Sequence, residues 1–174
     1  LCSENIKIEG EKVIILGAGG AARAVAYLCR YYGAVSIFLL NRNKAKAEEV
    51  AKEVNTAAKE QKVIPIGLEE FEVLPKEKML CIQATSVGLA PNTDQAVIEA
   101  KSFYERVHTG YDLIYRPGET LFMKLARKNG VKACNGVGML VYQGIISFEL
   151  WNNIHVTDEE AEILCKLITE ALGE

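Results

Sequence analysis

The chain reads VIILGAGGAARA from Val13 to Ala24, and this stretch decides the fold. An apolar run stops at a cluster of glycines and resumes as small residues, which predicts a buried strand, a tight turn and a helix. The turn carries Gly17-x-Gly19-x-x-Ala22, the fingerprint of dinucleotide-binding turns with alanine in the last place. Gly17 would permit the sharp turn, and Gly19 would let the backbone approach a pyrophosphate at the positive end of the helix. The alternative is an ordinary glycine-rich turn from strand to helix.

Length and composition indicate a globular protein with one domain. The 174 residues are enough for a substantial core, and 49% hydrophobic with 25% charged residues is ordinary for a folded chain. The net charge of −3 gives no reason to expect nucleic acid as a partner. No apolar stretch approaches the roughly 20 residues that span a bilayer, and the basic-then-apolar order of a signal peptide is missing. We therefore expect a cytoplasmic protein without a membrane or nucleic-acid partner.

The cysteines and histidines do not form a metal-binding pattern. The five cysteines are far apart and mostly lie in apolar runs: Cys2, Cys29, Cys81, Cys134 and Cys165. This distribution is typical of reduced thiols in a cytosolic protein. The two histidines are His108 and His155, too few for a histidine-based metal site. We expect no metal.

Strand-like runs alternate with helical segments along the whole chain, which predicts an α/β fold. We expect a single domain with a doubly wound, mostly parallel, Rossmann-type sheet, and strand order 3-2-1-4-5-6 is the leading choice. The strands are expected near Lys12–Leu16, Ser36–Leu40, Val63–Ile66, Met79–Gln83, Thr109–Leu113 and Val131–Cys134. The helices are expected near Ala21–Tyr32, Lys44–Glu53, Thr120–Lys128, Gly138–Trp151 and Asp158–Leu172.

Local signals mark several helix ends. Gly33 and Gly130 each follow a helical segment, where a left-handed closing residue is favoured. Thr157 and Glu160 form a capping box for the last helix. That helix carries an apolar stripe of the kind that normally belongs to a core, formed by Ala161, Leu164, Cys165, Ile168 and Leu172.

The end of the second strand indicates which dinucleotide would bind. An acidic residue there would bond the ribose 2′-hydroxyl of NAD, whereas a basic one accommodates the 2′-phosphate of NADP. Arg42 and Lys46 supply two cations, and no carboxylate lies between Leu40 and Lys46. The guanidinium of Arg42 can bond phosphate oxygens and stack on an adenine ring. NADP is the predicted cofactor, with a solvated helix start as the alternative.

Polar and glycine-containing loops follow the later strands at the same sheet edge, where open α/β sheets bind ligands. These loops contain Ala84-Thr85-Ser86, Tyr111 to Pro117, and Asn135 to Gln143. Reduction of a carbonyl by hydride also needs a group that moves a proton. The candidates are Tyr111, Tyr115 and Asp112, and none has an obvious sequence partner that would shift its pKa. A tyrosine followed four residues later by lysine is absent.

Taken in order, these segments resemble the C-terminal NADP-binding domain of shikimate dehydrogenases over nearly the whole chain. The motifs are GAGGAARA from Gly17, Asn41-Arg42, ATSVG from Ala84, Tyr111-Asp112 with Tyr115-x-Pro117-x-x-Thr120, and NGxGMLVxQ from Asn135. The resemblance implies reversible NADPH-dependent reduction of 3-dehydroshikimate to shikimate in aromatic amino acid biosynthesis. The Phe148 to Trp151 segment resembles the family's helix that returns toward the substrate lobe.

The resemblance also implies roles for individual residues. The pyrophosphate would contact Gly17, Ala18, Gly19, Gly20 and Ala21. The adenosine and its 2′-phosphate would contact Asn41, Arg42, Asn43 and Lys46. The nicotinamide side would contact Ala84, Thr85, Ser86, Leu113, Gly136 and Met139. The substrate, shikimate or 3-dehydroshikimate, would face Tyr115 and Gln143.

The chain departs from the family pattern at Gln83, where asparagine is usual, and at Asn43, where threonine is usual. Gln83 is longer and is expected to reposition its loop, while Asn43 keeps hydrogen-bonding capacity. The family's catalytic lysine and aspartate belong to an N-terminal substrate-binding domain, and their motif, Asn-Thr-Asp-Gly, does not occur here. We expect residues 1–174 to be the cofactor domain alone, without catalytic residues and inactive by itself. The alternatives are a quinate/shikimate dehydrogenase and a non-catalytic nucleotide sensor or regulatory relative.

Overall fold

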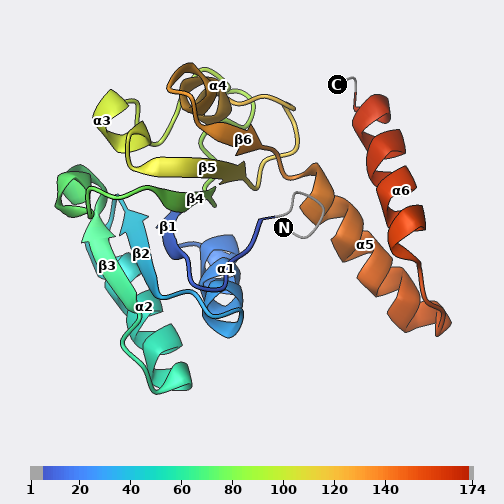
Figure 1. Ribbon diagram of the computed structural model, residues 1–174, viewed down its shortest axis with the longest axis horizontal. Coiled ribbons are helices and arrows are strands. Elements are labelled where there is room, and N and C mark those ends of the chain that lie inside the picture. The colour runs from blue at the N-terminus through green and yellow to red at the C-terminus, as the bar shows by residue number, and fades with distance from the viewer. Residues whose placement is uncertain (1–5, 173–174) are drawn as a thin grey trace.

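A computed structural model describes residues 6–172 and shows a six-stranded, all-parallel sheet with helices on both faces (Figure 1). The strands are β1 (Lys12–Leu16), β2 (Ser36–Asn41), β3 (Val63–Gly67), β4 (Met79–Gln83), β5 (Val107–Asp112) and β6 (Lys132–Cys134). Their order is β3-β2-β1-β4-β5-β6, and every neighbouring pair is parallel. The predicted fold class and strand order are confirmed. Cys2 lies outside the described residues.

The helices, apart from the last two, cover both faces of this sheet. They are α1 (Gly20–Tyr31), α2 (Lys44–Ala58), the 3-10 helix η2 (Leu68–Val73), α3 (Lys101–Tyr104), α4 (Leu121–Lys128), α5 (Val137–Asn152) and α6 (Asp158–Ala171). Alternate residues of β1 point to opposite faces, as a pleated strand requires. Val13 and Ile15 join the core beneath α1 and α2, whereas Ile14 and Leu16 join the core beneath α3 and α4. The first strand is therefore buried on both sides.

The predicted helix boundaries are confirmed where a capping signal exists. Gly33 and Gly130 have φ angles of 81° and 74°, the left-handed values expected after a helix. The Thr157 hydroxyl accepts a hydrogen bond from the Glu160 amide, and the Glu160 carboxylate accepts one from the Thr157 amide. The sequence patterns did not predict η2 and α3, because such short elements carry too few residues to show a helical period.

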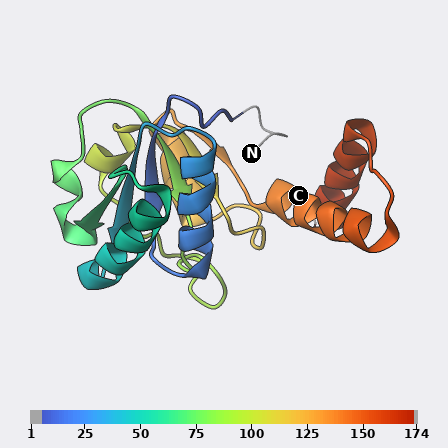
Figure 2. The ribbon, with the colours of Figure 1, turned by 90° about the horizontal axis from the view of Figure 1, so that it is seen from below.

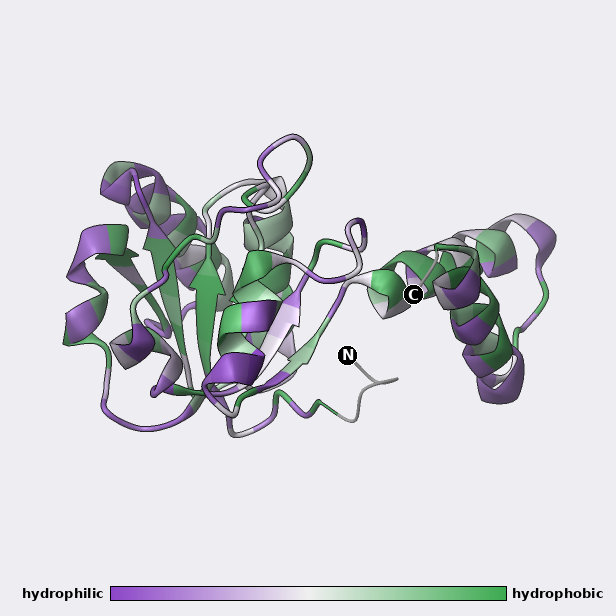
Figure 3. Cartoon of the chain, turned by 90° about the horizontal axis from the view of Figure 1, so that it is seen from above, coloured by the Kyte–Doolittle hydropathy of each residue, from purple (hydrophilic) through white to green (hydrophobic). Residues whose placement is uncertain are grey.

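Helices α5 and α6 pack on each other and stand beside the sheet, apart from the other helices (Figures 1 and 2). Their own core is small and contains four buried residues: Val137, Val141, Ile145 and Ala161. The predicted stripe on α6 is therefore only partly core, since Leu164 is 38% exposed. Leu150 and Trp151 on α5 are 77% and 83% exposed. Hydrophobic residues run along both helices (Figure 3), so this pair leaves apolar surface uncovered.

Within residues 6–172, each helix is either too short or too polar to cross a membrane.

Candidate dinucleotide site

The glycine turn joins β1 to α1 and needs glycine at its first position. Gly17 has a φ of 110°, a backbone angle that residues with a side chain rarely adopt. Its amide donates a hydrogen bond to the Leu40 carbonyl at 2.7 Å. A Cβ at this position would lie 2.9 Å from Thr85 Cγ2 and 3.0 Å from the Ala84 carbonyl oxygen. Gly17 therefore lets the loop after β4 approach the turn. Ala18 is buried behind it.

The second part of the turn opens to a cleft. Gly19 is the N-cap residue of α1 and provides no side-chain cap for the first amides of the helix. A Cβ at Gly19 or Gly20 would meet nothing within 4 Å. Both residues line the cleft together with Ala21. This is open space at the positive end of a twelve-residue helix, and such space suits an anion.

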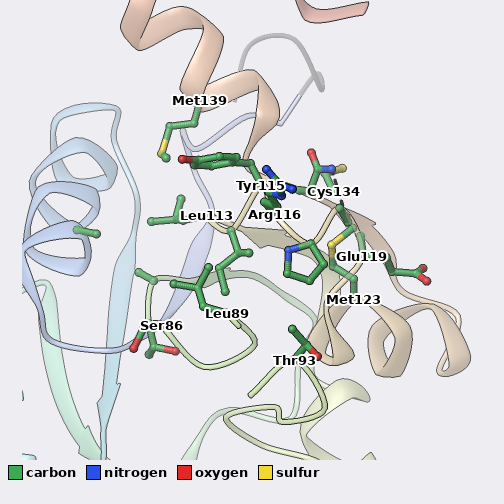
Figure 4. Close-up of a pocket in the computed structure, with 18 of the residues that line it drawn as sticks. Ser86, Leu89, Thr93, Leu113, Tyr115, Arg116, Glu119, Met123, Cys134 and Met139 are labelled. Carbon is green, nitrogen blue, oxygen red and sulfur yellow. Dashed lines mark hydrogen bonds between the residues drawn. The ribbon is translucent and has the colours of Figure 1, made fainter. Parts of the chain in front are cut away.

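The cleft has a volume of about 1940 Å³ and follows the carboxyl ends of β4, β5 and β6 (Figure 4). Ten of the predicted site residues line it: Gly19, Gly20, Ala21, Ala84, Thr85, Ser86, Leu113, Tyr115, Met139 and Gln143. In the view of Figure 4, Tyr115 and Met139 are both drawn above Leu113 at the edge of the cleft. The structure thus brings together segments that are more than a hundred residues apart in the chain.

Gly136 does not line the cleft but shapes its wall. A Cβ there would lie 2.2 Å from the Leu113 carbonyl oxygen, and the Gly136 amide donates to the Ile114 carbonyl at 3.0 Å. Glycine is needed because the loops after β5 and β6 touch at this point. The predicted contact between Gly136 and a nicotinamide ring stays a prediction.

The β2–α2 turn and the start of α2 carry positively charged side chains that do not line the cleft. The Asn41 side chain donates to the Asn43 carbonyl at 2.8 Å, which braces the turn. Arg42 and Lys46 are exposed and form no ion pair within residues 6–172, whereas Lys44 is paired with Glu70 at 2.7 Å. The turn adjoins the glycine turn through the bond between Gly17 and Leu40. Two unpaired cations therefore stand near the start of α1.

A buried polar network lies beneath the cleft. Asp112 is 0% exposed, and its carboxylate accepts hydrogen bonds from the Gln83 side chain, the Ile114 amide and the Thr120 hydroxyl. Burial raises the pKa of Asp112 to about 6, although the Thr120 and Ile114 bonds oppose the rise. The shift comes from desolvation by the surrounding core and not from a charged partner, and sequence spacing does not show such burial.

Among the predicted proton-transfer candidates, only Tyr115 lines the cleft, with 39% of its surface exposed. Tyr111 and Asp112 are buried in the sheet. The described residues contain no group of three or more His, Cys, Asp or Glu side chains that could hold a metal ion. The residues of the cleft can bind and orient a ligand, and Tyr115 is their one predicted proton-transfer group.

Sequence reasoning missed several cleft residues. The cleft is also lined by Leu89 and Thr93 from the loop after β4, by Thr169 on α6 and by Leu172 directly after α6. No motif marks these positions. Thr120 could have been recognised as a helix cap, since a threonine directly before the apolar α4 segment is a common helix start.

Comparison with known proteins gives consistent family matches. Residues 1–102 match the family described as "Shikimate / quinate 5-dehydrogenase", and residues 136–156 match "Shikimate 5'-dehydrogenase C-terminal domain". The chain is 39% identical over 170 residues to a relative from Methanosarcina acetivorans named "Shikimate dehydrogenase (NADP(+))". This alignment covers 96% of the chain and 58% of the relative.

Solved structures agree with these matches. A chorismate mutase/shikimate 5-dehydrogenase fusion protein from Clostridium acetobutylicum superposes with a TM-score of 0.86 at 32% identity, over 100% of this chain and 60% of that one. A shikimate dehydrogenase in complex with NADP+ superposes with a TM-score of 0.79 at 32% identity, over 95% and 56%. The chain therefore spans less than two thirds of the length of these relatives.

Proposed function

We propose, because the chain belongs to the shikimate / quinate 5-dehydrogenase family, that it is the NADP-binding domain of a shikimate dehydrogenase. The whole enzyme would reversibly reduce 3-dehydroshikimate to shikimate with NADPH. The observation that carries the proposal is the open start of α1, where Gly19, Gly20 and Ala21 line a cleft. The name of the relative that is 39% identical to this chain includes NADP(+).

The residues present fit a dinucleotide with a 2′-phosphate. The amides from Gly17 to Ala21 would bind the pyrophosphate at the positive end of α1. Arg42 and Lys46, with Asn41 and Asn43 shaping their turn, would bind the 2′-phosphate, because both cations are exposed and unpaired within residues 6–172. A relative solved with NADP+ supports this choice of cofactor.

Farther along the cleft from the glycine turn, residues after β4 and β5 and on α5 would orient the nicotinamide and the substrate. Bound NADPH supplies the hydride for reduction. Leu113 and Met139 provide an apolar wall that excludes water from one side of the ring, and Ala84, Thr85 and Ser86 would hold the adjoining ribose and phosphate. Tyr115 and Gln143 are exposed on the cleft and would contact shikimate. The catalytic lysine and aspartate would come from a substrate-binding domain outside this chain.

The uncovered apolar surface of α5 and α6 supports such a further domain. Leu150 and Trp151 are largely exposed, although side chains of this size are normally buried. The relatives are also longer than this chain, which covers 58% of the Methanosarcina acetivorans protein. Cys29, Cys81 and Cys134 are buried in the core, which suits a reducing compartment and supports a cytoplasmic enzyme.

Isothermal titration of the chain with NADPH and NADH tests the cofactor assignment. We expect tighter binding of NADPH, and equal affinity for the two cofactors would overturn the assignment. A sensor would also bind a nucleotide, so a second assay follows NADPH formation with shikimate and with quinate. We expect no turnover by the chain and robust shikimate oxidation by the full-length protein.

Gln143→Ala in the full-length protein separates substrate binding from cofactor binding. We expect impaired use of shikimate with unchanged NADP affinity, because Gln143 lies on α5 at the substrate side of the cleft. Turnover by the isolated chain would instead point to a proton-transfer group within it, with Tyr115 the first candidate.

A further inference from the structure

Two loops form facing walls of the cleft, and both are tied to the same buried side chains. One wall is Ala84–Ser86 after β4, and the other is the segment from Leu113 to Gly118 after β5. Gln83, Asp112 and Thr120 lie beneath them, each 0% exposed. None of these three residues lines the cleft. We infer that Gln83, Asp112 and Thr120 form a positioning unit that fixes the two walls for the nicotinamide end of the dinucleotide, an inference that rests on the proposed function.

The register of the sheet brings the first two side chains together. Gln83 and Asp112 end neighbouring strands and are direct partners in the β4–β5 pairing. An irregularity places one extra residue, His108, on β5 between the partners of Met79 and Leu80. A pairing displaced by one residue would turn the Asp112 side chain to the opposite face of the sheet. With this bulge in the register, Asp112 is the residue opposite Gln83.

Gln83 holds the first wall by both ends of its amide. Its oxygen accepts a hydrogen bond from the Thr85 amide, and its nitrogen donates to the Val87 carbonyl at 3.0 Å. The same nitrogen donates to Asp112 at 3.3 Å. The side chain thus folds back into its own loop and links that loop to β5. This conformation explains how a glutamine is accommodated here.

Asp112 holds the second wall. It accepts from the Ile114 amide at 3.0 Å, inside the wall, and from the Thr120 hydroxyl at 2.6 Å, where the wall ends. The Thr120 oxygen in turn accepts from the Met123 amide and so caps α4. The segment between Asp112 and Thr120 is therefore pinned at both ends by one carboxylate.

Just beyond the first wall, the loop after β4 also approaches Thr120. Gly88 has a φ of 102°, and a Cβ there would lie 3.4 Å from the Thr120 side chain and 3.5 Å from Ile114. Thr120 consequently contacts the loop after β4 and bonds the strand before its own loop. Removal of its hydroxyl would release the second wall while leaving the side-chain volume nearly unchanged.

Thr120→Val tests the inference, with Thr120→Ser as the conservative partner that keeps the hydroxyl. The readout is titration with two ligands, NADPH and adenosine 2′,5′-bisphosphate, because the second carries only the adenosine end. We expect Thr120→Val to weaken NADPH binding about tenfold, because NADPH would then have to order the released wall as it binds. Adenosine 2′,5′-bisphosphate affinity should not change, and Thr120→Ser should bind NADPH like the wild type.

Thr157→Val provides the matched control, since it removes the same kind of helix cap from α6 without a link to either wall. It should leave both affinities unchanged.

Gln83→Met, which keeps the length of the side chain but loses the amide, should reproduce the selective loss of NADPH affinity. An equal loss for both ligands, or unchanged NADPH affinity in a folded Thr120→Val chain, would reduce the network to a structural role and overturn the inference. A wild-type chain that binds adenosine 2′,5′-bisphosphate but not NADPH would also overturn it, whereas one that binds neither would overturn the proposed function as well.

Discussion

The β2–α2 turn and the network beneath the loops after β4 and β5 flank the same glycine turn but are built in opposite ways. The first offers the exposed cations Arg42 and Lys46 with no ion-pair partner in residues 6–172. The second buries Asp112 completely and surrounds it with neutral donors. Gly17 lies between the two regions, because its amide bonds Leu40 in β2, just before the turn, and a Cβ on it would meet Thr85 in the loop above the network.

In the proposed complex, the two regions would hold one ligand in different ways. Exposed cations attract a phosphate over several ångströms and can adjust their side chains, so their contribution depends on charge and is screened by salt. The buried network fixes the backbone before any ligand arrives, so its contribution depends on geometry. We therefore expect variants of the turn to respond to ionic strength and variants of the network to respond to pH.

The largest effect is expected at the glycine turn that both regions share. Gly19→Val should weaken NADPH binding at least about a hundredfold, because the side chain would occupy the space where the pyrophosphate approaches α1. Folding should be unaffected, since a Cβ at Gly19 meets no neighbouring atom within 4 Å. Calorimetry and thermal unfolding measure the two properties. Gly144→Val, at an equally open position on α5, is the control, and wild-type affinity in Gly19→Val would make the turn purely structural.

The next effect concerns the buried carboxylate and the pH dependence of stability. Folding raises the pKa of Asp112 from 3.8 to about 6, so the folded chain binds more protons than the unfolded chain between these values. The contribution of Asp112 to stability therefore falls as the pH rises through this range, by about 3 kcal/mol in all. Asp112→Asn should remove this dependence, because an asparagine can still accept from Gln83 and Ile114 without a charge.

Urea unfolding from pH 4 to pH 7.5 measures this difference. The advantage of Asp112→Asn over the wild type should grow with pH and level off above pH 6. Asp94→Asn, on an exposed loop, should show no such trend. A constant difference across the range would mean that Asp112 is not strained by burial.

The sequence predicted the strands better than it predicted this network. The apolar runs of β1 and β4 end at glycine or small polar residues, and their observed bounds match the prediction at both ends. The network depends on side chains 29 residues apart, which the β4–β5 register, with its bulge in β5, places opposite each other. Bulges leave no reliable trace in a hydrophobic pattern, and the predicted fifth strand began two residues late for the same reason.

The site residues show the same contrast between local sequence patterns and contacts made through space. The family resemblance predicted ten of the residues that line the cleft, and each of these lies in a loop at a strand end or on the helix that follows it. It could not predict that Gly136 contacts the Leu113 backbone, because that contact joins two loops through space. The helical period of α6 likewise indicated an apolar face without indicating how much of that face α5 would cover.

A moderate effect is expected from Arg42. Arg42→Ala should weaken NADPH binding roughly tenfold to a hundredfold and leave NADH binding unchanged, because only NADPH carries the 2′-phosphate. The loss should shrink as salt is added, in contrast to Thr120→Val. Lys52→Ala, which removes an exposed cation further along α2, is the control. Equal losses for both cofactors would place Arg42 at the pyrophosphate or in the fold instead.

The smallest effect concerns Lys44, the cation near the β2–α2 turn that is already in an ion pair. Lys44 is held by Glu70, whose carboxylate also accepts from the Gly67 amide opposite Asn41 in the β2–β3 pairing. Each partner keeps the other charged: the bond raises the pKa of Lys44 and lowers that of Glu70. Glu70→Gln should free Lys44 for the 2′-phosphate and tighten NADPH binding up to about threefold at low salt, as expected for an exposed ion pair.

Glu69→Gln is the control, because it removes the same charge from the neighbouring residue, which forms no ion pair within residues 6–172. It should tighten NADPH binding less than Glu70→Gln does. If both variants tighten NADPH equally, the gain reflects net charge alone, and Lys44 has no place at the phosphate.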